Sequence, residues 1–153
     1  MPPIIRPAHI DEYDEVGRVW MESWVSTGLG EASNFLLANL RARVRRDIEG
    51  GWSLYVADDR GTLAAMLALH VPKRNLDQIF VAPDYQGRSV GRQLLAFTRT
   101  QLPDEIWLRC VRENEKAWRW YERESFVYEK EEFEPVTGFM MKYYRWKKEG
   151  QKP

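Results

Sequence analysis

The sequence predicts one α/β domain with a mixed sheet and helices on both faces. Helical and strand periodicities follow one another along the chain in the order β-α-α-β-β-β-α-β-α-β-β, which favours this class. The segment 63–71 is apolar on both of its faces, which indicates a central strand covered on each side. The length of 153 residues suits a single domain with a sizeable core.

The helices are predicted from apolar residues that recur near a period of 3.6. In 10–25 these residues share one face, and Asp and Glu occupy the first turn. Gly50 and Gly51 mark the end of the second helix, and Pro103 ends the third. The expected helices are 10–25, 35–48, 90–102 and 114–124.

The strands are predicted from short apolar or alternating segments bounded by turn residues. The first is flanked by prolines, which places it at or near an edge of the sheet. The expected strands are 3–7, 52–57, 63–71, 77–81, 106–111, 125–133 and 139–146. We expect one domain over 1–147, followed by a polar tail at 148–153.

Composition excludes several functions. Lys plus Arg equals Asp plus Glu at 23 each, whereas proteins that bind nucleic acid through its phosphates usually carry a basic excess. One cysteine and two histidines cannot form an intramolecular disulfide or a cysteine-rich or histidine-rich metal site. These counts predict a reducing, cytoplasmic setting. No apolar run reaches the roughly 18 residues of a membrane span, so no membrane association is expected.

The stretch 76–92, LDQIFVAPDYQGRSVGR, reads as a strand, a glycine-bearing loop and the first turn of a helix. The first N–H groups of a helix lack partners and lie at the positive end of its dipole, so they suit a phosphate. Gly87 and Gly91 allow close approach of the backbone, and Arg88 and Arg92 add positive charge. This pattern predicts a pyrophosphate-bearing cofactor held mainly by backbone; the alternative is a simple tight turn.

Other phosphate-binding signatures are absent from this stretch. No Lys-Ser or Lys-Thr follows Gly91, so it is not a Walker loop. Position 89 is Ser, so the glycine fingerprint of dinucleotide-binding folds is incomplete.

A second informative segment is 111–126, VRENEKAWRWYERESF. Asn114 fits a helix N-cap with Ala117 at its third helical position. Tyr121 lies seven residues after Asn114, about two helical turns, so both side chains share a face. Taken alone, Tyr121 is better explained as a structural tyrosine that packs its ring and hydrogen-bonds its hydroxyl.

Together, the order strand–QGRSVG–helix–strand–N-x6-Y-x4-F resembles the GCN5-related N-acetyltransferase (GNAT) family. Gln86 and Gly91 match the family's cofactor-loop pattern. The motifs run from Leu54 to Phe126, and the element order extends the resemblance to nearly the whole chain. The resemblance implies a GNAT-like, mostly antiparallel sheet of about seven strands.

The resemblance also implies transfer of an acetyl group from acetyl-CoA to a primary amine by direct attack, with CoA as product. It implies that a backbone N–H of the strand, expected to be that of Val81, would polarise the thioester carbonyl. It also implies that Tyr121 would be the general acid for the CoA thiolate. Implied cofactor-binding residues are Ile79, Phe80, Val81, Gln86, Gly87, Arg88, Ser89, Val90, Gly91, Arg92 and Asn114.

Two serines depart from the family pattern. Ser89 stands where the family has its first motif glycine, and there it would cost roughly 1 kcal/mol if the position needs a positive φ. Its hydroxyl could offset this by donating to a phosphate oxygen. Ser125 stands where a glycine usually ends the tyrosine-bearing helix.

The base and the acceptor are less defined. Asp77 is the first candidate for the catalytic base and Glu22 the second, although either is also consistent with a surface charge. His70 and Cys110 are expected to be structural. The turn at 133–139 is expected to complete an acceptor pocket formed by Glu22, Trp24, Leu29 and Phe35.

The acceptor itself is a small-molecule or peptide amine that the sequence does not identify, and a homodimer is a candidate state because dimers are common in the family. The main alternative function is a non-catalytic acyl-CoA-binding module on the same fold. An interaction domain with a vestigial loop and a nucleotide-binding protein of another fold are further alternatives.

Overall fold

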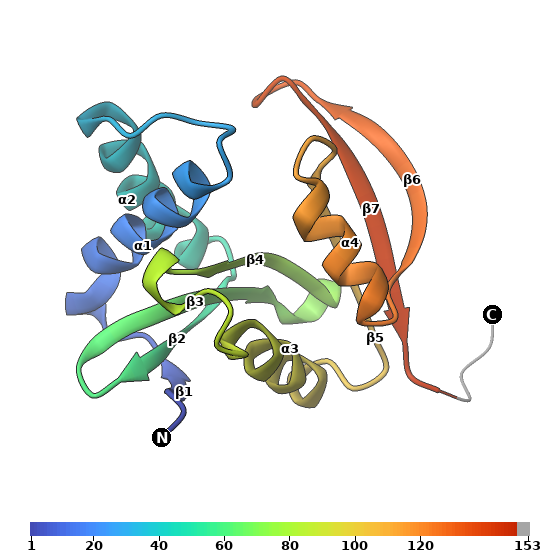
Figure 1. Cartoon of the computed structure of the whole chain (residues 1–153), viewed down its shortest axis with the longest axis horizontal. Helices are drawn as coiled ribbons and strands as arrows, with labels where there is room; N and C mark the ends of the chain where they lie inside the picture. Colours follow the sequence, from blue (N-terminus) through green and yellow to red (C-terminus); the bar gives the residue numbers. More distant parts are fainter. Residues whose placement is uncertain (150–153) are drawn as a thin grey trace.

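The computed structural model describes residues 1–149, which form one sheet with helices on both faces (Figure 1). The sheet order is β1-β2-β3-β4-β5-β7-β6, and only the β4–β5 pair is parallel. The strands are β1 (Ile4–Pro7), β2 (Ser53–Asp59), β3 (Thr62–His70), β4 (Asn75–Val81), β5 (Glu105–Val111), β6 (Val127–Glu134) and β7 (Phe139–Lys147). The α-helices are α1 (Tyr13–Ser26), α2 (Asn34–Glu49), α3 (Val90–Gln101) and α4 (Glu115–Arg123). The mixed, mostly antiparallel sheet is confirmed.

The core has two layers, one on each side of β3. Val19 of α1 and Met66 of β3 belong to one buried cluster, together with residues of α2. Leu94 of α3 and Leu67 of β3 belong to the other, together with residues of α4. Because β3 is buried from Leu63 to Leu69, the prediction of a central strand covered on both faces is confirmed.

The element boundaries differ from the sequence prediction in two informative places. α1 begins at Tyr13 after a single 3₁₀ turn, where the Glu12 carboxylate accepts from the His9 N–H at 2.8 Å. β6 begins at Val127, two residues later than expected, because Ser125 has a φ of 75° and ends the preceding helix.

The last strand of the chain is followed by a short segment that contacts the residue just before β5. β7 ends at Lys147, and the Lys148 N–H donates to the Asp104 carbonyl at 3.0 Å. Of the predicted polar tail, 150–153 lies outside the described residues. Within 1–149, no helix is both long enough and apolar enough to cross a membrane.

Candidate active site

β4 and β5 diverge after one paired position (Figure 1). Asn75 pairs with Trp107, and the Asn75 Nδ2 group donates to the Trp107 carbonyl at 3.1 Å. Among the described residues, no other residue of β4 is paired with a residue of β5 in the sheet. The sheet therefore opens between them toward their C-terminal ends.

The edge of β4 presents unpaired backbone groups to this opening. The Ala82 N–H donates to the Ala64 carbonyl of β3 at 2.8 Å. Because successive residues of an extended chain direct their N–H groups to opposite sides, those of Ile79 and Val81 point away from β3 and into the opening. The Val81 carbonyl points the same way and accepts from Gln86 Nε2 at 3.1 Å. An extended ligand arm can pair with such an edge.

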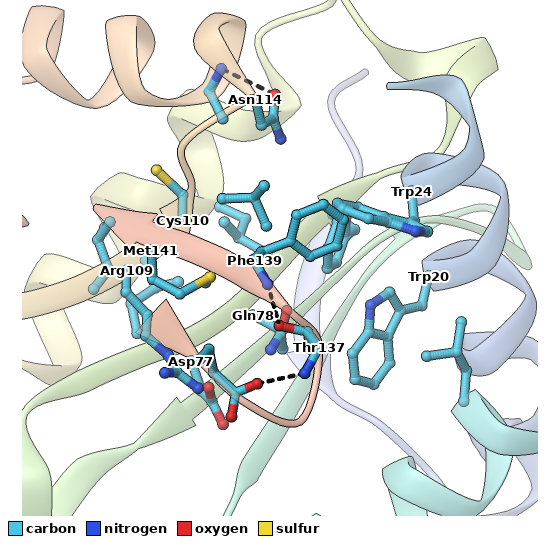
Figure 2. A pocket seen from close by; sticks show the side chains of 18 of the residues that line it. Trp20, Trp24, Asp77, Gln78, Arg109, Cys110, Asn114, Thr137, Phe139 and Met141 are labelled. Carbon is cyan, nitrogen blue, oxygen red and sulfur yellow. Dashed lines mark hydrogen bonds between the residues drawn. The ribbon is translucent and has the colours of Figure 1, made fainter. Parts of the chain in front are cut away.

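A cavity of about 330 Å³ occupies the opening. Its walls come from α1, α2, α4, β4, β5 and the segment 134–141, which are far apart in the sequence. Figure 2 shows Trp20 and Trp24 of α1 on one side of the cavity and Arg109, Cys110 and Met141 on the other. Aromatic and aliphatic surface dominates, with a few charged groups among it.

The loop that joins β4 to α3 is shaped for a phosphate. Gly87 has a φ of 79°, and no atom lies within 4 Å of where a Cβ would stand. Ser89, the N-cap of α3, has a φ of 65° and makes no side-chain cap bond. The first N–H groups of α3 thus lack a side-chain acceptor, as a phosphate site requires. Ser89 therefore occupies the left-handed region, the condition under which a serine strains the backbone there.

Side chains on either side of this loop fix its shape. Gln86 Nε2 reaches Ser26 of α1 at 3.3 Å as well as the Val81 carbonyl. The Arg88 guanidinium lies 5.4 Å from the centre of the Tyr85 ring. A Cβ at Gly91 would lie 3.3 Å from Trp120, so glycine allows α3 and α4 to approach each other.

α4 brings an amide and a phenol to the cavity. The Asn114 side chain accepts from the Ala117 N–H at 3.4 Å, which confirms the predicted N-cap (Figure 2). Asn114 and Tyr121 both line the cavity, so the predicted shared face is confirmed. Tyr121 is only 6 % exposed, and burial raises the pKa of its hydroxyl well above the usual value. The phenol is therefore neutral at physiological pH and able to donate a proton.

Cys110 also lines the cavity but is poorly suited to nucleophilic attack. Burial raises the pKa of its thiol to about 12, and the thiolate is the reactive form. His70 lies outside the cavity lining, with its Nε2 at 3.3 Å from the Gly50 carbonyl.

Asp77 is the carboxylate that β4 brings to the cavity (Figure 2). Its Oδ2 accepts from the Trp52 indole N–H at 2.6 Å, which fixes the side chain. A carboxylate oxygen has more than one lone pair, so the group can still accept a proton from a ligand.

The acceptor side differs in part from the sequence prediction. Trp24 lines the cavity and meets the Phe139 ring edge-on at 5.9 Å, and the turn residues Glu134 and Thr137 also line it, as expected. Glu22, Leu29 and Phe35, which were expected to line the same pocket, do not.

Helix geometry explains these corrections. Glu22 is two residues from Trp20 and from Trp24, roughly 200° around the helix, so it faces away from them. It accepts from Arg18 and lines a separate small depression. Phe35 is 78 % exposed at the start of α2, and Leu29 is half-buried in the loop after α1, outside the lining.

The cavity-lining residues of α1 and α2 that the sequence analysis did not predict are spaced so that they lie on one face of each helix. Leu36, Leu40 and Arg43 of α2 lie at i, i+4 and i+7 and line the cavity, as do Trp20 and Trp24 of α1 at i and i+4. This spacing was available in the sequence and identifies one face of each helix. It did not show that the two faces meet over β4.

Solved structures share this fold. A GCN5-related N-acetyltransferase from Rhodopseudomonas palustris superimposes with a TM-score of 0.79 at 15% identity, covering 96% of both chains. The PaiA N-acetyltransferase of Thermoplasma acidophilum, in complex with coenzyme A, gives 0.69 at 21% identity, covering 96% of this chain and 99% of that one. YncA of Salmonella typhimurium, with its cofactor acetyl-CoA, gives 0.69 at 12% identity, covering 99% and 96%. At these identities the likeness shows the fold.

The sequence gives the family independently. No curated protein matches the chain. Residues 14–126 match the sequence profile described as the acetyltransferase (GNAT) family, a range that covers most of the chain and includes both the glycine loop and α4. The split sheet, the loop before α3 and the tyrosine of α4 lie where the motif resemblance placed them. The chain therefore belongs to the acetyltransferase (GNAT) family.

Proposed function

We propose that this protein transfers an acetyl group from acetyl-CoA to a primary amine by direct attack. The observation that carries the proposal is the cavity between β4 and β5, where a neutral phenol, a carboxylate and an unpaired strand edge meet. We further propose the reducing, cytoplasmic setting expected from the single cysteine.

The residues present fit acetyl-CoA. The loop from Gln86 to Ser89 and the first turn of α3 would hold the pyrophosphate through backbone N–H groups. The free edge of β4 at Ile79 and Val81 would pair with the pantetheine arm, and Asn114 lies along the same cavity. When bound, acetyl-CoA supplies the acetyl group as a reactive thioester.

Three groups of the chain would then carry the chemistry. A backbone N–H of the free β4 edge would donate to the carbonyl oxygen as negative charge develops there. Ile79, which lines the cavity with Asp77 and Tyr121, fits this role better than Val81, which lies outside the lining and nearer the loop. Asp77 accepts the proton that the amine loses as its nitrogen bonds to the acetyl carbon. Tyr121 donates its phenolic proton to the sulfur as the carbon–sulfur bond breaks.

The raised pKa of Cys110 supports direct attack over an acetyl-cysteine route. The alternative function is a non-catalytic acyl-CoA-binding module, which would use the same loop and strand edge. The presence of Tyr121 at the cavity wall counts against this alternative, and a comparison of turnover in Tyr121→Phe and the wild type distinguishes the two.

Calorimetric titration with acetyl-CoA and with CoA tests the cofactor, and release of CoA in the presence of amines tests the transfer. Binding with turnover supports the proposed enzyme. Binding without turnover for any primary amine would leave the acyl-CoA-binding module. No binding at millimolar acetyl-CoA would contradict the cofactor assignment.

A further inference from the structure

Arg43 is the charged residue that α2 brings to the acceptor side of the cavity. Its guanidinium carbon lies 4.8 Å from the centre of the Trp20 ring, which also lines the cavity. Stacking on an indole holds a guanidinium in place while leaving its N–H groups free for a ligand. The arginine is therefore held at the wall.

Arg43 makes only one ion pair within the described residues, a long contact with a carboxylate. Its Nε is buried without a hydrogen-bond partner, and its Nη2 lies 3.7 Å from Asp47, beyond hydrogen-bond distance. Asp47 already accepts from Arg46 at 3.3 Å. By contrast, Arg45 on the same helix pairs with Asp14 at 2.7 Å. Arg43 retains donors that a planar anion can use in a bidentate contact.

Two carboxylates and a second arginine complete the charges of the cavity lining. Asp77 of β4 and Glu134 at the end of β6 both line it, and a carboxylate there favours the ammonium form of an incoming amine. The acceptor side thus carries positive charge from Arg43 and negative charge from these carboxylates. Arg109 of β5 lies on the opposite side of the cavity from Trp20, the ring on which Arg43 stacks (Figure 2). A ligand with one ammonium and one carboxylate matches both signs, whereas a polyamine would place its second cation against Arg43.

The remaining acceptor wall is apolar. Trp24 and Phe139 meet edge-on at 5.9 Å, and Leu36 and Leu40 of α2 line the cavity near Arg43 in the helix. Such a wall suits an apolar side chain on the carbon that links the ammonium and carboxylate groups of the ligand.

We propose that the acceptor is an amino acid with an apolar side chain, whose carboxylate binds Arg43 and whose amine is directed to Asp77. This inference rests on the proposed acetyl transfer. It assigns a substrate class to the acceptor half of the cavity and a substrate-binding role to Arg43.

The test compares free L-amino acids with their amides as acceptors at saturating acetyl-CoA. Spermidine tests a polyamine acceptor, and O-phosphoethanolamine tests an amine whose anion is a phosphate. We expect an apolar amino acid to exceed its amide in kcat/KM by about tenfold or more, because one charge-assisted bidentate contact is lost in the amide. Arg43→Gln should abolish that ratio and leave the amide rate within about twofold. Arg45→Gln is the matched control, because Arg45 lies on the same helix outside the cavity lining and pairs with Asp14, and it should change neither rate.

A second readout is binding. The preferred amino acid, titrated into the protein saturated with CoA, should bind about tenfold more weakly to Arg43→Gln than to the wild type. Amides, spermidine or O-phosphoethanolamine acetylated as well as or better than free amino acids would overturn the inference while leaving acetyl transfer intact. Equal losses for acid and amide in Arg43→Gln would also overturn it. Failure of acetyl-CoA to bind, or absence of turnover with every amine, would instead contradict the proposed function and the inference with it.

Discussion

The two halves of the cavity are built in different ways. The cofactor half uses backbone groups that are close in sequence, from the free edge of β4 and the loop at Gln86–Ser89. The acceptor half uses side chains from α1, α2, β4 and the turn between β6 and β7. A backbone site depends on local conformation, whereas a side-chain site depends on how distant elements pack. Changes in the first half should therefore alter cofactor affinity, and changes in the second should alter turnover and selectivity.

The largest expected effect is at Tyr121, which lines the cavity from α4. Tyr121→Phe removes the proton that we assign to the departing sulfur and keeps the buried ring against Trp120 and Phe126. We expect kcat to fall on the order of 10³-fold, with little change in the dissociation constant for acetyl-CoA. Steady-state CoA release and calorimetry on the same preparation measure the two quantities.

The pH profile sharpens the Tyr121 prediction. Burial raises the pKa of the phenol, so the proton-donating form persists as pH rises through the usual pKa of tyrosine, near 10. The wild-type rate should therefore show no loss between about pH 9 and pH 10.5 that is absent from Tyr121→Phe. Unchanged turnover in Tyr121→Phe would remove the general-acid role.

The next effect is at Asp77. Asp77→Asn keeps an acceptor for the Trp52 indole N–H but removes the proposed base. We expect kcat to fall on the order of 10²-fold at neutral pH. Raising the pH should recover part of the rate, because the amine then loses its proton to solvent before it binds. A variant with wild-type kcat at every pH would show that another group or water accepts the proton.

The cofactor half is tested at Gly91. Gly91→Glu places a carboxylate at the start of α3, where we expect phosphate, and acetyl-CoA should bind about tenfold more weakly or worse. Gly91→Ala is the matched control, because its Cβ meets the same Trp120 ring at 3.3 Å without adding charge. If both variants bind equally weakly, the contact with Trp120 and not the charge sets the affinity.

The contrast between the halves also explains what the sequence could show. The strand, the loop with Gly87 and the N-cap at Asn114 follow from local residue preferences, and each is confirmed. So is the shared face of Asn114 and Tyr121, because it depends on the repeat of one helix alone. The catalytic roles themselves stay predictions.

The acceptor half was predicted less well, for a physical reason. Trp24 and the 133–139 turn were placed correctly, but Glu22 and Phe35 were chosen for their position near a loop and not for the face they occupy. Arg43 was missed because its role depends on how α2 packs against α1, which no local pattern in α2 specifies. Counting helical positions from Trp24 would have excluded Glu22 and favoured Trp20.

The smallest effects concern two serines that separate stability from affinity. Ser89 and Ser125 have φ values of 65° and 75°, a region that favours glycine. Ser89→Gly and Ser125→Gly should each raise stability by about 0.5–1 kcal/mol, since the strain relieved exceeds the entropy that glycine adds to the unfolded chain. Thermal unfolding should show this as a rise in Tm of about 1 to 4 °C per variant.

Only one of these serines lies in the cofactor half, so acetyl-CoA affinity should distinguish the two. Ser125 follows α4 outside the cavity lining, and Ser125→Gly should leave the dissociation constant unchanged. Ser89 caps α3, and Ser89→Gly should weaken binding by about threefold to tenfold if its hydroxyl donates to a phosphate oxygen. Tighter binding in Ser89→Gly would show that the serine only strains the loop. A matching change in Ser125→Gly would mean that α4, and not the loop, transmits the effect, and the division of the cavity into a backbone half and a side-chain half would fail.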